Sequence, residues 1–91
     1  MTEPRPLLAM DPDRARAVAA VLGTRSDRLA ELTRRLDAAV RRAAWHGPDR
    51  ERFLQEWTTR VAPGVERVSE LLAAHATTLR VEADQQDAAS R

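Results

Sequence analysis

The stretch Ala44 to Trp57, AWHGPDRERFLQEW, separates two long helical patterns in a chain of 91 residues. It holds both tryptophans and the only phenylalanine of the chain. Gly47 can take the positive φ that ends a helix, and Pro48 cannot continue that helix but fits the first turn of the next. Asp49 and Glu51 then favour the positive end of a helix dipole. The stretch predicts a bend at 46–47 with a helix on each side.

The residues before the bend predict one helix over about 11–45. Asp11 can cap it, Pro12 fits its first position and Asp13 complements its dipole. Its seam, a row of positions spaced alternately by four and three, comprises Val18, Leu22, Arg25, Leu29, Leu32, Leu36, Ala39 and Ala43. Such heptad spacing predicts packing along another helix. Residues 1–10 lack this period and predict a loose N-terminal arm.

The residues after the bend predict a second helix over about 48–88, with 89–91 as a flexible tail. Its seam comprises Leu54, Trp57, Val61, Gly64, Val68, Leu71, His75 and either Thr78 or Leu79. Pro63 removes the hydrogen bond to the Thr59 carbonyl and predicts a kink near 59–63. A complete break, which would give three helices, is the alternative.

The fold class that follows is all-α: an antiparallel helical hairpin that pairs into a four-helix bundle dimer. A hairpin alone encloses no core, so we expect a homodimer or a heterodimer with a sister hairpin protein. Candidate residues at the bundle end are Phe53 and Trp57. Candidate interface residues off the seam, without a partner inside the hairpin, are Val21, Val40, Phe53, Leu72 and Leu79.

Charge supports antiparallel helices. Residues 11–44 hold eight arginines and five acids, whereas residues 48–88 hold five arginines and eight acids. At the open end, Arg14 and Arg16 are expected near Glu82, Asp84 and Asp87. At the bend, Arg34, Arg35, Arg41 and Arg42 are expected beside Asp49, Glu51 and Glu56.

Trp45-His46-Gly47, at the midpoint of a cysteine-free chain of two helices, resembles the WxG family of small type VII secretion substrates, the early-secreted-antigen-like proteins of actinobacteria and their relatives. The resemblance covers about residues 11–90. It implies export through a signal at Trp45 and Gly47, contact with a type VII secretion ATPase, and a protein that is cytoplasmic before export and then secreted. The family's signal adds Tyr-x-x-x-Asp or Glu near the end of the second helix, and this chain has no tyrosine. A partner's tail is expected to supply that element.

The bend also predicts a docking surface without the resemblance. A large ring beside Gly-Pro should stay partly exposed, and exposed aromatic side chains at a bundle tip favour protein contacts. The alternative is that Trp45, Phe53 and Trp57 only plug the end of the bundle.

Other functions are disfavoured. The chain has no cysteine, two histidines and no Glu-x-x-His pair, so we predict no enzyme, no metal site and no cofactor. His75 is interpreted as a core-edge histidine.

No apolar run approaches the ~20 residues of a membrane span, so we expect no membrane insertion and no cleaved secretory leader. The Arg34, Arg35, Arg41 and Arg42 cluster could face phosphates, but a net charge of +1 favours a solvated, paired face and no nucleic-acid partner. A cytoplasmic helical adaptor or coiled-coil chaperone that is not exported remains the alternative function.

Overall fold

The first helix begins where its capping residues predict. In a computed structural model of the chain, which describes residues 11–43 and 45–90, α1 spans Pro12–Arg42. The Asp11 side chain accepts a hydrogen bond from the backbone N–H of Arg14. The helix ends three residues short of the predicted 45, because Ala43 turns to an extended conformation (φ −58°, ψ 134°). The predicted arm at 1–10 lies outside the described residues.

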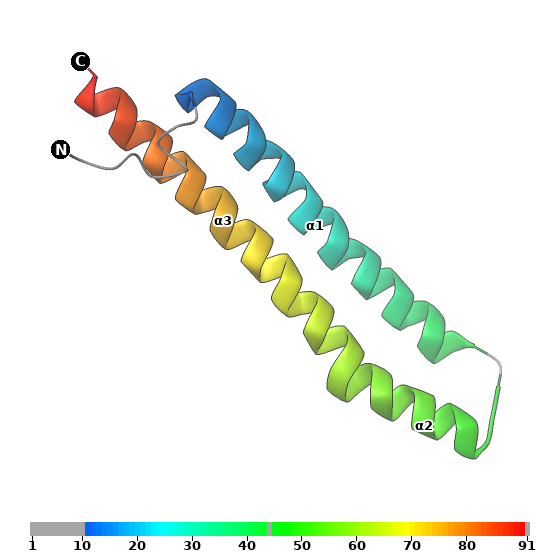
Figure 1. Ribbon diagram of the computed structural model, residues 1–91. Helices are drawn as coiled ribbons and strands as arrows, with labels where there is room; N and C mark the ends of the chain where they lie inside the picture. The colour runs from blue at the N-terminus through cyan, green and yellow to red at the C-terminus, as the bar shows by residue number, and fades with distance from the viewer. Residues whose placement is uncertain (1–10, 44, 91) are drawn as a thin grey trace.

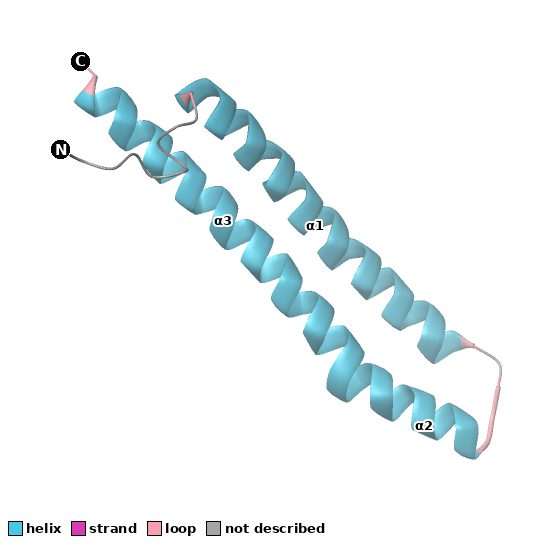
Figure 2. Ribbon diagram, in the orientation of Figure 1, coloured by secondary structure: helices cyan, strands magenta, loops and turns pink. Residues whose placement is uncertain are grey.

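The second half of the chain is one nearly continuous helical line. It consists of α2 (Pro48–Glu56), the five-residue π-helix η1 (Trp57–Val61) and α3 (Ala62–Ala89). α3 runs antiparallel to α1 along most of its length, with the bend at one end and both described chain ends at the other (Figure 1). Every described element is helical (Figure 2). The predicted all-α hairpin is confirmed, and the four-helix bundle stays a prediction.

Small side chains form the contact between the two arms. Ala15 and Ala19 of α1 pack with Ala76, Leu79 and Ala83 of α3, and Val18 and Leu22 lie against this cluster. Further along, Ser26 and Ser69 face each other: each Oγ donates to the other residue's carbonyl, at 2.8 and 3.0 Å. Small residues allow close approach of two helices, since the interaxial distance is set by the side chains at the contact.

The predicted seam holds at Val18 and Leu22, which pack on the core, and at Trp57, but it is off by one residue over much of the rest of both arms. Leu32 and Leu36 of α1 and Val68 and Leu71 of α3 are exposed, and so is His75, which is not the core-edge residue expected. At several positions the buried residue directly follows the predicted one: Ser26 follows Arg25, Ser69 follows Val68 and Ala76 follows His75. Leu79 is part of the hairpin core, which confirms it over Thr78 as the last seam residue and corrects the expectation that it lacks a partner there. Val40 and Leu72 are half-buried.

The π-helix explains why the second seam starts correctly and then slips. Trp57 is buried, as the seam predicts, and the Ala62 N–H bonds back to the Trp57 carbonyl five residues earlier. A π-turn holds one residue more than an α-turn, so every later side chain is rotated by one position. Pro63 follows within the first turn of α3, where its ring would clash with the Thr59 carbonyl of a regular α-helix. The wide turn, at the place where a kink was predicted, relieves that clash.

Candidate functional site

The bend presents an aromatic pair. The rings of Trp45 and Phe53 meet edge to face with centroids 5.5 Å apart. Both stay partly exposed, at 37% for Trp45 and 41% for Phe53. Gly47 has φ 106°, and a Cβ there would meet nothing within 4 Å. The glycine is thus required for backbone conformation rather than for space.

Trp57 has a different environment from Trp45. It is 6% exposed, and its Nε1 donates to Asp37 Oδ1 at 2.8 Å. Asp37 Oδ2 accepts from Arg41 Nε at 3.0 Å. The hydrogen bonds from Arg41 and then Trp57 lower the pKa of Asp37 below its ordinary value. Trp57 therefore fastens α1 to the second arm, whereas Trp45 contributes a surface.

Sequence reasoning missed Asp37. Its only signal was an acid four residues before Arg41 and directly after a seam leucine. Of the four bend arginines, Arg41 pairs within its own helix. Arg34 instead lines a shallow groove with Glu66 and Glu70, so the expected pairing with α2 acids is not the arrangement formed.

One broad side of the hairpin is polar. Arg16 of α1 pairs with Asp84 at 2.8 Å and with Asp87 at 2.6 Å, as the charge pattern predicts for the open end. A Cβ on Gly23 would lie 3.5 Å from the Arg80 guanidinium. Each of these residues except Asp87 directly follows a core-contact residue of its helix. Residues that directly follow core residues in the sequence of each helix therefore lie near one another on this side of the hairpin.

The opposite broad side is apolar. In two antiparallel helices, the residues one step before the core positions are rotated about 100° the other way and lie together on the other side. We call this the apolar face and define it by six aliphatic side chains exposed by 41–59%: Val21, Leu32 and Leu36 of α1, Val61 of η1, and Val68 and Leu71 of α3.

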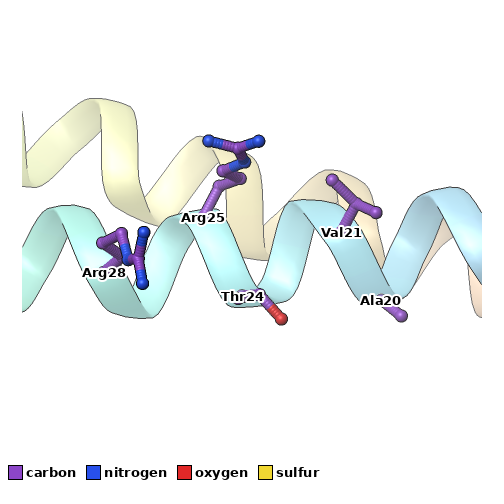
Figure 3. Close-up of a pocket in the computed structure, with 5 residues that line it drawn as sticks. All are labelled: Ala20, Val21, Thr24, Arg25 and Arg28. Atoms are coloured by element: carbon purple, nitrogen blue, oxygen red, sulfur yellow. The ribbon is translucent and has the colours of Figure 1, made fainter.

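Three arginines accompany the α1 part of the apolar face. Arg25, Arg28 and Arg35, which we call the basic edge, line shallow grooves with Val21 and Leu32, and Asp27 and Glu31 also line the groove that holds Arg28 and Arg35. Figure 3 shows Val21 and Arg25 extending from α1 on one side, with Ala20 and Thr24 on the other. Among the described residues, none of the three has an ion pair or a side-chain hydrogen bond.

The predicted site residues therefore fall into separate groups. Trp45 and Phe53 lie together at the bend with Gly47 nearby, Val21 lies on the apolar face, and Trp57 and Leu79 lie between the arms. Across residues 11–43 and 45–90, no group of three His, Asp or Glu side chains is placed to hold a metal ion. None of the helices formed by these residues is apolar over enough length to span a bilayer. No protein-family model, curated protein or solved structure matches this chain.

Proposed function

We propose that this chain is a small non-enzymatic hairpin protein exported as a folded dimer by a type VII secretion system. Trp45 and Gly47 at the bend form the export signal. A sister hairpin protein supplies the Tyr-x-x-x-Asp or Glu element that this chain lacks. The observation that carries the proposal is the partly exposed Trp45–Phe53 pair beside a glycine with positive φ.

The contrast between the two tryptophans supports a docking role for the first. Trp57 is buried and hydrogen-bonded, so packing between the arms accounts for it. Trp45 has Phe53 as its ring partner and keeps 37% of its surface in water. Rigid aromatic side chains contribute strongly when a partner covers them, which suits contact with a secretion ATPase.

The apolar face supports the dimer part of the proposal. A row of aliphatic side chains along one side of a hairpin is the surface by which helical pairs form four-helix bundles. The opposite side, with Arg16 and Asp84 paired on it, is suited to water.

The test is secretion from a host with an intact type VII system, with and without a co-expressed sister protein that carries the Tyr-and-acid tail. Trp45→Ala should stay folded and paired but should not be released into the medium. Gly47→Ala should do the same, with a strain cost of about 1–3 kcal/mol. Trp57→Ala is the matched control, because it should lose folding first.

Release of Trp45→Ala at the wild-type level would refute the export signal. Failure of every variant, wild type included, under all pairings would favour a cytoplasmic helical adaptor. The observation that supports this alternative is that the chain has no tyrosine and so lacks the second part of the family's export signal.

A further inference from the structure

We infer that the occupant of the apolar face is an acidic helical partner rather than a second copy of this chain. The partner is a helical hairpin whose own apolar stripe is bordered by carboxylates. This inference rests on the pairing that the proposed function requires, and it specifies the partner's charge.

The basic edge carries the argument. Arg25 falls in the same row as Leu32, and Arg28 and Arg35 lie one heptad apart along the outer border of that row. From Arg25 to Arg35 the three guanidinium groups extend over ten residues, about 15 Å of helix, and the acids Asp27 and Glu31 line the same groove as Arg28 and Arg35 without forming an ion pair with them. No carboxylate lies within ion-pair distance of these three guanidinium groups in the part of the chain that the structure describes.

A second copy would not neutralise these charges. If α1 packs on α1 of the other copy, two basic edges approach each other, and like charges across an interface cost several kcal/mol. If α1 packs on the second arm instead, the three guanidinium groups meet a row that contains Val61, Val68 and Leu71 and a single acid, Glu82, directly before the buried Ala83. That arrangement removes three positive charges from water and offers one carboxylate for them, which is also unfavourable.

A partner with carboxylates at these positions satisfies both parts of the surface. Its apolar stripe covers the six aliphatic side chains, and its acids accept charge-assisted hydrogen bonds from the basic edge. The described chain measures 64 × 22 × 13 Å, so its broad side has room for the ~800 Å² that each partner contributes to a standard interface.

The probe is this chain's own charge-reversed variant, Arg25→Glu/Arg28→Glu/Arg35→Glu. Its affinity for the wild type is compared with wild-type self-association by analytical ultracentrifugation at ~150 mM salt. We expect the one-to-one mixture to pair at least tenfold more tightly than the wild type pairs with itself. The difference should shrink at ~1 M salt, where the Debye length falls to ~3 Å.

A matched control reverses two exposed arginines of the polar side, as Arg34→Glu/Arg80→Glu, and is compared with Arg25→Glu/Arg28→Glu. It changes net charge equally and should not tighten pairing with the wild type. A neutral variant, Arg25→Gln/Arg28→Gln/Arg35→Gln, should self-associate more tightly than the wild type, and this result does not depend on the folding of the acidic variant.

Three results would overturn the inference. They are wild-type self-association as tight as the mixture, equal tightening by the control, or no association in any combination. The readout is pairing in solution and involves no export. A failure of secretion with intact pairing would therefore reject the proposed function, and a failure of charge dependence with intact secretion would reject only the acidic partner.

Discussion

Deletion of Thr59 tests whether the π-turn acts as a single inserted residue. Trp57 and the core positions of α3 both face α1. The turn between them is wide, because Ala62, the first residue of α3, comes five residues after Trp57 and bonds back to its carbonyl. Removing one exposed residue from this turn should restore an α-turn without rotating either side. The Thr59 side chain bonds only to the Gln55 carbonyl of its own helix, so little else is lost.

The expected magnitude depends on Pro63. With the proline present, an α-turn brings its ring against the carbonyl four residues earlier, which costs about 3 kcal/mol. With Pro63→Ala added, we expect the deletion variant to lie within about 1 kcal/mol of the wild type. Pro63→Ala alone should keep the π-turn, because the extra residue and not the proline sets the phase of α3.

Deletion of Ala74, an exposed residue in the regular part of α3, is the matched control. It would put Arg80 in the place of Leu79 and Asp84 in the place of Ala83, between the two arms. Loss of the leucine alone costs about 2–5 kcal/mol, and burial of charge adds to it.

The measurement is the free energy of unfolding, from urea denaturation followed by far-UV circular dichroism at one fixed protein concentration. The Thr59 deletion with Pro63→Ala should unfold near the wild-type midpoint, and the Ala74 deletion should be largely unfolded. Equal damage from the two deletions would refute the phase argument.

Three further outcomes are expected. Ser26→Ala should cost about 1 kcal/mol of unfolding free energy, because it removes one buried interhelical hydrogen bond, whereas Ser90→Ala at the exposed end should cost less than about half of that. Asp37 has a folded-state pKa below its ordinary 3.8, so the stability it contributes is present above pH 3.8 and is lost as pH falls through the folded pKa. Urea titrations against pH should therefore show wild type and Asp37→Asn converging only in acid, and a constant difference would contradict this. Replacing the four bend arginines Arg34, Arg35, Arg41 and Arg42 with Gln should change stability only modestly, and neither the wild type nor this variant should bind duplex nucleic acid. Duplex binding by the wild type at ~150 mM salt that the substitutions remove would instead support a nucleic-acid partner.

The sequence was sufficient for the helices and the bend but not for the rotation of each helix. Asp11, Pro12, Gly47 and Pro48 mark boundaries through local backbone chemistry, which does not depend on tertiary contacts. The rotation of each helix about its axis decides which of two adjacent rows of side chains faces the other arm, and this depends on tertiary packing. Ranking positions by hydrophobicity selected the row of Leu32, and the arms pack through smaller residues.

In the candidate site, too, the features set by local sequence were predictable and those set by contacts between the arms were not. Partial exposure of Trp45 followed from the Gly-Pro bend, which is local. The Trp57–Asp37 hydrogen bond joins residues twenty apart in the chain, and the core positions of α3 beyond it are shifted by the one-residue slip in the π-turn. No spacing rule for a uniform α-helix anticipates such a slip, because the rule assumes the same rotation at every step.

The choice of the smaller row for the inner contact has an energetic consequence. The buried residues between the arms are mostly alanine and serine, with Trp57 and Leu79 as the large apolar side chains among them. Hydrophobic stabilisation scales with the apolar area removed from water, so this contact gives the isolated hairpin little stability. The larger aliphatic side chains, such as Leu32 and Leu71, are on the apolar face and contribute fully only when a partner covers them. Folding and pairing are therefore linked by mass action, and the arginines beside that face influence which partner stabilises the fold.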